Sequence, residues 1–271
     1  MKKVFQSLFL LLAGLFLVSC STAPITGRQQ LKLVDDEKLA SQYSAEYDQM
    51  IAQLKQQGLL ANSTKDGIRV KNVGDRLATA VEKYLKENGQ AKKVDYLNWE
   101  FNLIKSNEVN AFALPGGKIA FYTGIMPIAK NDAGIAAIMG HEIGHVIVGY
   151  HAEGQSNQTA AGIILLGKQV ADVVTGGATA VVSNDLVSQG LSLGLLKFNR
   201  TQEYEADKYG MIFMAMAGYN PEESLAVWER MAAGGSAGGP EILSTHPNTE
   251  NRIKKMKEFL PEAMKYYNQS K

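Results

Sequence analysis

The stretch Asn131–His151 (NDAGIAAIMGHEIGHVIVGYH) decides the fold, because it predicts one helix with the motif His141-Glu142-Ile143-Gly144-His145 at its centre. His141 and His145 are four residues apart, so a helix places both imidazoles on one face, one turn apart. Two neutral imidazoles in this arrangement can bind one Zn²⁺ ion at about 2.0–2.1 Å. Glu142 can then take the proton of a water on that metal. The helix is apolar nearly all round, so we expect a zinc site in a cleft over the core.

Length and composition bound the class of protein. The 271 residues are 45% hydrophobic and 20% charged, which suits one globular domain or at most two. The formal net charge is +1 and no block of like charge occurs, so we expect no nucleic-acid partner. Cys20 is the only cysteine, which excludes a disulfide within the chain and a cysteine-rich zinc site. Any metal must therefore be held by histidines and carboxylates.

The first 19 residues have the features of a secretory signal. Two lysines are followed by the apolar run Leu8–Val18, which is shorter than the roughly 20 residues that span a membrane. The run leads into Leu17-Val18-Ser19-Cys20, which resembles a bacterial lipobox and implies that Cys20 is the lipidated first residue of the mature chain. The alternative is an ordinary signal peptide with an incidental cysteine.

The lipobox resemblance also sets an expected location. Residues 20–30 are polar and are expected to form a tether from the lipid on Cys20. We therefore expect a protein that is lipid-anchored on the periplasmic face of a bacterial membrane. Ser21 rather than an aspartate follows the cysteine, which favours the outer membrane over the inner one.

Apolar periodicity predicts two helices and a small sheet before the motif. The helices cover about Asp35–Gly58 and Ser63–Glu87, and alternation predicts strands at Tyr96–Lys105 and Lys118–Thr123. A turn at Pro115-Gly116-Gly117 precedes the second strand.

The residues before that turn are a candidate substrate strand. Asn110, Ala111 and Phe112 would lie beside the metal cleft, where a free strand edge could bind a peptide through main-chain hydrogen bonds. The alternative is an ordinary hairpin.

Two features after the motif leave more than one interpretation open. His151 is expected at the surface or as a helix cap. Residues 160–197 are rich in glycine, alanine, valine and leucine, but Asp172 and Asp185 leave no uncharged stretch long enough to span a bilayer. They form either buried helices or a lid or membrane-facing insert.

A later helix offers the third metal ligand. It opens at Asn199 and places Glu203 and Asp207 on one face at four-residue spacing. Glu203 can complete a His₂Glu zinc site that leaves one position for water, and Asp207 can accept the free ring N–H of a ligating histidine. The alternative is a solvated acidic helix start.

These motifs together resemble a known family. The HExxH motif at 141–145, Arg200-x-x-Glu203-x-x-Ala-Asp207 and the stretch 110–117 are similar to the peptidase family forty-eight zinc proteases, gluzincins of the HtpX and CAAX prenyl protease type. The resemblance covers about residue 31 to the end. With its lipobox, the chain is most similar to the small periplasmic lipoprotein members.

The resemblance adds roles near the C-terminus. His246-Pro247 followed by Arg252 is similar to a motif of the family, which implies that His246 lies near the metal and donates to the oxyanion of the tetrahedral intermediate. His246 could instead occupy the fourth zinc position at rest. Arg252 could orient a neighbouring carboxylate, and the sequence does not say which.

The expected fold is a mainly helical α+β, zincin-like metalloprotease domain over residues 31–271, with a small β-sheet beside the HExxH helix. One Zn²⁺ per chain would be held by His141, His145 and Glu203, and the zinc-bound water would attack the peptide carbonyl with Glu142 as general base. The family implies that the substrates are misfolded or mis-assembled envelope proteins.

Two other interpretations remain open. One is an envelope assembly factor or scaffold with secondary or no proteolysis, which would bind envelope-assembly partners. The other is a purely structural zinc site, which three protein ligands and an open position disfavour.

Overall fold

The computed structural model describes residues 20–23, 26–160, 198–233, 246 and 250–271. The expected signal segment 1–19 lies outside the described residues, and so does the expected insert except for Ala160. The described helices and strands are β1 (Cys20–Thr22), β2 (Gln29–Leu31), α2 (Asp36–Gln56), α3 (Lys65–Glu87), η1 (Ala91–Tyr96), β3 (Glu100–Ile104), β4 (Ala111–Leu114), β5 (Lys118–Tyr122), η2 (Thr123–Ile125), α4 (Met126–Ala129), α5 (Asp132–Val148), α8 (Arg200–Met216), α9 (Glu222–Ala233) and α11 (Glu250–Gln269). Residues 150–160 are also helical.

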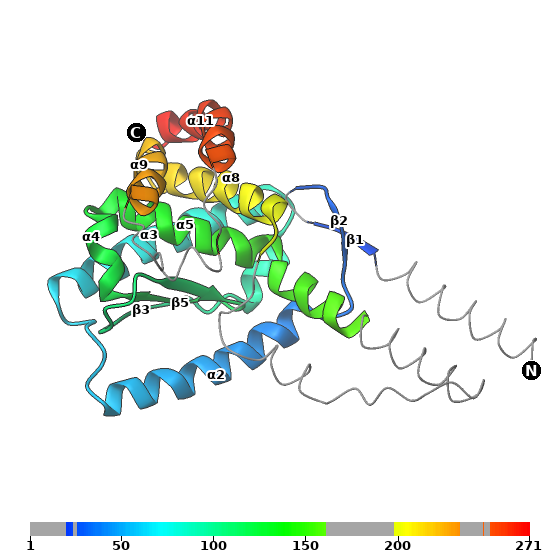
Figure 1. Ribbon diagram of the computed structural model, residues 1–271. Coiled ribbons are helices and arrows are strands. Elements are labelled where there is room, and N and C mark those ends of the chain that lie inside the picture. Colours follow the sequence, from blue (N-terminus) through cyan, green and yellow to red (C-terminus); the bar gives the residue numbers. More distant parts are fainter. Residues whose placement is uncertain (1–19, 24–25, 161–197, 234–245, 247–249) are drawn as a thin grey trace, which may run out of the picture.

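The elements form layers around a three-stranded sheet. Its strand order is β3-β5-β4, with β3 parallel and β4 antiparallel to β5. Figure 1 shows α2 on one face of the sheet, α3 and α5 on the other, and α8, α9 and α11 stacked beyond α5. This arrangement confirms the mainly helical α+β fold with a small sheet beside the HExxH helix.

The sheet departs from expectation at its first strand. β3 begins at Glu100 rather than Tyr96, because Ala91–Tyr96 forms the 3₁₀ helix η1. The turn before β5 is confirmed: Gly116 and Gly117 have φ angles of 88° and 82°, a left-handed conformation that other residues rarely adopt.

Helix α5 is shorter than the expected Asn131–His151. The Asn131 side chain accepts a hydrogen bond from the Gly134 N–H and caps the helix start. Gly149 has φ 89° and ends the helix after Val148, so a second helical stretch at 150–160 leaves at a different angle. The expectation of one continuous helix was wrong because this glycine acts as a C-terminal cap.

Glycines let α5 and α8 pack backbone to backbone. A Cβ on Gly140 would lie 2.7 Å from the Gly210 carbonyl oxygen, and one on Gly144 would lie 2.8 Å from the Ala206 carbonyl oxygen. Neither distance leaves room for a methyl group, so these glycines permit the close approach. The approach brings the histidines of α5 against the first turns of α8.

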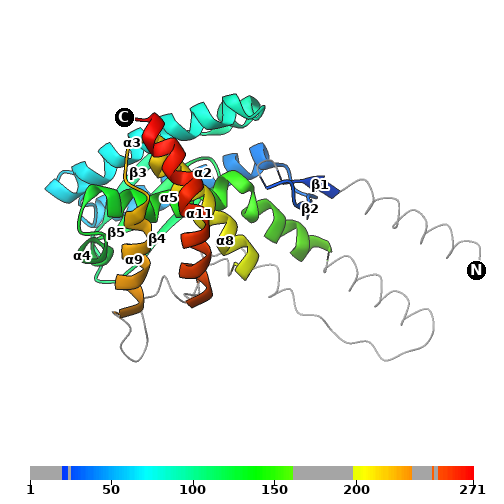
Figure 2. The same ribbon diagram turned by 90° about the horizontal axis from the view of Figure 1, so that it is seen from above.

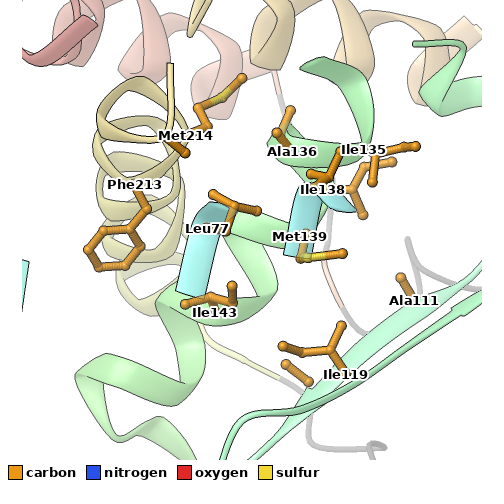
Figure 3. Packing of buried hydrophobic residues seen from close by; sticks show 14 of the residues in the cluster. Leu77, Ala111, Ile119, Ile135, Ala136, Ile138, Met139, Ile143, Phe213 and Met214 are labelled. Atoms are coloured by element: carbon orange, nitrogen blue, oxygen red, sulfur yellow. The ribbon is translucent and has the colours of Figure 1, made fainter. Parts of the chain in front are cut away.

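The main hydrophobic core surrounds α5. From Gly134 to Val148, every α5 residue except Val146 is buried. Figure 3 shows Met139 and Ile143 of α5 between Leu77 of α3, Phe213 of α8 and Ile119 of β5. The metal motif therefore lies on a helix that this core surrounds. In the part of the chain that the structure describes, no helix has the length and hydropathy needed to cross a membrane.

The strand β1 and most of β2 lie in the stretch 20–30 that was expected to be a tether. They pair antiparallel, Ser21 opposite Gln30. The chain that follows is fixed to the helical residues 150–160, because the backbone N–H groups of Leu33 and Val34 both donate to Ser156 Oγ, at 2.9 and 3.2 Å. This hairpin lies beside that helix in both overall views (Figures 1 and 2).

Candidate metal centre

Four side chains from three parts of the chain meet at one buried point. His141 and His145 come from α5, Glu203 comes from the first turn of α8, and His246 precedes α11. Each is at most 4% exposed, and one ligand atom from each lies within 4.8 Å of the others. The structure therefore brings together all the residues that the sequence singled out as possible ligands.

The separations of these atoms fit a metal ion. His141 Nε2 lies 3.1 Å from His145 Nε2 and 3.2 Å from His246 Nδ1. Glu203 oxygens lie 3.4 Å from His145 Nε2, 3.5 Å from His141 Nε2 and 2.9 Å from His246 Nδ1. Ligands about 2.0–2.1 Å from a tetrahedral zinc are separated by about 3.3–3.4 Å. Neutral imidazoles and a carboxylate are also the donor types that zinc accepts.

The start of α8 explains how Glu203 is aimed. Asn199 and Gln202 form a reciprocal capping box, with Gln202 N donating to Asn199 Oδ1 at 3.1 Å. Glu203 and Asp207 then share one face of the helix. Asp207 Oδ1 lies 2.9 Å from His141 Nδ1, which leaves Nε2 of that ring toward the cluster.

Arg252 contacts the carboxylates of Asp207 and Glu203. Arg252 is fully buried in α11, and its Nε and Nη2 donate to both oxygens of Asp207, at 2.6 and 2.7 Å. Its Nη1 lies 2.8 Å from Glu203 Oε2, and its guanidinium stacks 3.5 Å above the ring of Trp228. One guanidinium thus contacts both Glu203 and Asp207 of α8.

The pKa values of the ionisable groups in the cluster are shifted in different directions. Burial raises the pKa of Glu142, and its Oε1 has no hydrogen-bond partner among the described residues. Burial also opposes ionisation of Glu203 and Asp207, but the nearby Arg252 holds the pKa of each carboxyl below its ordinary value. Burial lowers the pKa of His145 well below its ordinary value, which keeps the imidazole in its neutral, metal-binding form.

The prediction for His151 was wrong. The side chain is 5% exposed and packs edge-on against Tyr43 at 6.1 Å and Phe198 at 5.8 Å between ring centroids. It is buried because Gly149 redirects the chain after α5 and turns this residue toward α2.

Aromatic side chains that the sequence did not single out surround the cluster. Phe198 stacks on His145 with ring centroids 3.8 Å apart, and Tyr150 approaches the same ring at 5.6 Å. Trp228 approaches the edge of His141 at 5.3 Å. No local pattern in the sequence marks these three residues as neighbours of the cluster.

The candidate substrate strand lies beside the motif helix. β4 packs on α5, and β5 is its only sheet partner in the part of the chain that the structure describes. Ala111 is buried, whereas Phe112 is half-buried and packs edge-on against Tyr122 at 6.2 Å. Asn110 receives a main-chain hydrogen bond from Tyr122 N and so extends the pairing.

A mainly helical α+β domain, in which a buried HExxH helix meets a glutamate from a second helix, defines the class of zincin-like metallopeptidases. Within that class the family can be stated. The chain belongs to Peptidase family M48, whose model matches residues 72–260.

Individual relatives agree with the family. The chain is 36% identical over 170 residues to the mitochondrial metalloendopeptidase OMA1 of Schizosaccharomyces pombe, covering 62% of this chain and 48% of that protein. It is 34% identical over 223 residues to the protein of the same name in Saccharomyces cerevisiae, covering 79% and 62%. The beta-barrel assembly-enhancing protease of Escherichia coli is 29% identical over 166 residues, covering 57% and 33%. The chain thus spans about half the length of these relatives.

These matches contradict the expected location. The relatives named mitochondrial match at 36% and 34% identity, above the 29% of the bacterial relative. The expectation of a bacterial outer-membrane lipoprotein anchored at Cys20 was therefore wrong. It rested on a short lipobox-like stretch, which carries far less information than a match over more than half of the chain.

Proposed function

We propose that this protein is a zinc-dependent endopeptidase in which His141, His145 and Glu203 hold the metal. The observation that carries the proposal is the buried cluster of ligand atoms at separations that suit a tetrahedral ion. The names of the relatives, metalloendopeptidase and protease, support the same activity.

The side chains around the cluster have separate tasks in this proposal. Bound zinc would supply a Lewis acid that polarises the peptide carbonyl and acidifies water. Glu142 takes the proton of the attacking water and passes it to the leaving amine, and its raised pKa favours that exchange. Asp207 fixes the ring of His141, and Arg252 keeps Glu203 ionised.

His246 has two possible roles, and its position favours one of them in this conformation. Its Nδ1 lies among the ligand atoms, 3.2 Å from His141 Nε2, as a fourth ligand would. Its Nε2 lies 3.6 Å from Glu142 Oε1. We infer that His246 closes the metal site at rest and becomes available as an oxyanion donor only after it leaves that position.

The unpaired edge of β4, with Asn110, Ala111 and Phe112, is the proposed binding strand for the substrate. Main-chain pairing recognises an extended chain with little regard to its sequence. That suits substrates that have failed to fold or to assemble, and the assembly function in the name of the E. coli relative agrees with this class.

The experiment that tests the function is Glu142→Gln. The variant should keep its zinc, because Glu142 is not a ligand, but lose casein cleavage by several orders of magnitude, because the proton acceptor is gone. Zinc content and cleavage rate are measured side by side with wild type. Glu229→Gln on the exposed face of α9 is the matched control and should keep both. Undiminished cleavage by Glu142→Gln would remove this residue from the mechanism.

The same variant separates two other functions from proteolysis. The assembly-related name of the E. coli relative also supports an assembly factor or scaffold, which would still complement a deletion strain with Glu142→Gln. With four protein ligands, the site could also be purely structural. A structural site has no use for a buried glutamate with a free oxygen, and wild-type casein cleavage that depends on zinc would exclude it.

A further inference from the structure

Arg28, in the turn between β1 and β2, binds two acidic residues at once. Its Nη1 and Nη2 donate to the two oxygens of Glu153, at 2.8 and 2.6 Å, as a parallel pair. Its Nε donates to Glu205 Oε2 at 3.3 Å. The side chains of Arg28, Glu153 and Glu205 are 27%, 9% and 18% exposed, so water screens these charges less than at an open surface.

The two carboxylates belong to the segments that carry the metal ligands. Glu153 lies in the helical residues 150–160 that continue the chain after α5, and Glu205 follows Glu203 in α8. Figure 2 shows the hairpin beside the helical residues 150–160, and the contact of Arg28 Nε with Glu205 Oε2 places its turn against α8. Arg28 therefore joins the His141 and His145 side of the cluster to the Glu203 side.

Further contacts carry this connection to the ligands. Gln202, next to Glu203, donates from Nε2 to Glu153 Oε2 at 3.1 Å. Tyr150 donates its hydroxyl to Glu205 and places its ring 5.6 Å from that of His145. A shift of either carboxylate therefore reaches a ligand through one intervening side chain.

We propose that Arg28 is a positioning residue of the metal centre, which holds the two ligand-bearing segments at the separation that the ion requires. Without its guanidinium, Glu153 and Glu205 would face each other as like charges across the junction of 150–160 and α8. The repulsion would move Glu203 away from the histidines. This inference rests on the metal centre of the proposed function.

The test is the zinc affinity of full-length Arg28→Gln, measured by competition with a chromophoric chelator. We expect a loss of about tenfold, the lower end of what outer-shell partners of metal ligands contribute. The matched control is Arg69→Gln. The Arg69 side chain is 23% exposed and also contacts two carboxylates. These are Asp66 of α3 and Asp132, which begins α5 at the end away from the histidines. The control should keep the wild-type affinity.

A rescue separates positioning from general stability. Adding Glu153→Gln and Glu205→Gln to Arg28→Gln removes the repulsion, and should restore most of the zinc affinity. Equal affinities of wild type and Arg28→Gln would overturn the inference, and so would an equal loss in Arg69→Gln or a triple variant without rescue. A wild-type chain that binds no zinc would instead refute the proposed function and this inference with it.

Discussion

At the residue scale, the pKa values of two buried glutamates in one cluster are shifted in opposite directions. Glu203 lies 2.8 Å from Arg252, which holds the pKa of its carboxyl below the ordinary value, as a metal ligand requires. Glu142 is buried with a free oxygen, and burial raises its pKa. One environment suits a ligand and the other suits a proton acceptor.

His151 provides a prediction at the same scale. Burial lowers its pKa to about 4, whereas an unfolded histidine titrates near about 6.5. Between these values the unfolded chain binds a proton that the folded chain does not, so the free energy of unfolding falls as the pH falls. The loss should reach up to about 3 kcal/mol.

The measurement is urea unfolding of metal-free wild type and His151→Leu at pH 7 and pH 4.5. The variant loses packing at both pH values, but its stability should fall less steeply than that of wild type. Identical pH dependence in the two proteins would show that folding does not lower the pKa of His151.

At the element scale, the contact between α5 and α8 sets the geometry of the site. Gly140 and Gly144 on α5 and Gly210 on α8 leave no space for a Cβ between the two backbones. The separation of the two helices therefore fixes the distance from the histidines to Glu203.

Gly144→Ala tests this contact. Its Cβ would lie 2.8 Å from the Ala206 carbonyl oxygen, so α8 must move. Overpacking of this kind costs typically about 1–3 kcal/mol, and we expect zinc affinity to fall with stability. Gly74→Ala is the control, because its Cβ would overlap the Phe101 ring on β3 instead. It should lower the melting temperature but keep zinc affinity, and equal affinity in both variants would contradict this role of α8.

Local patterns predicted the elements better than the contacts between them. Helical spacing was enough to pair His141 with His145 and Glu203 with Asp207, because those distances depend only on helix geometry. The bend at Gly149 is a local glycine cap that the apolar pattern around it did not reveal. The parallel pairing of β3 with β5 depends on how distant segments pack, and no periodicity in the sequence reports that. The contacts of Arg28 and Phe198 were missed for the same reason.

At the scale of the whole molecule, the metal centre joins separate parts of the fold. α5, α8 and the segment before α11 each supply candidate ligand atoms, and Arg252 of α11 contacts Glu203 and Asp207 of α8. A bound ion would therefore stabilise the packing of these parts, because it binds the folded chain and not the unfolded one.

The most direct test of the account is the zinc content of purified wild type and Glu203→Ala by elemental analysis, with Glu203→Gln as a variant that keeps the shape of the side chain. Glu229→Ala, on the exposed face of α9, is the control. The account predicts one zinc per chain in wild type and the control, and a clear loss in both Glu203 variants. Full zinc occupancy after loss of the Glu203 carboxylate, or a wild type without zinc, would contradict it.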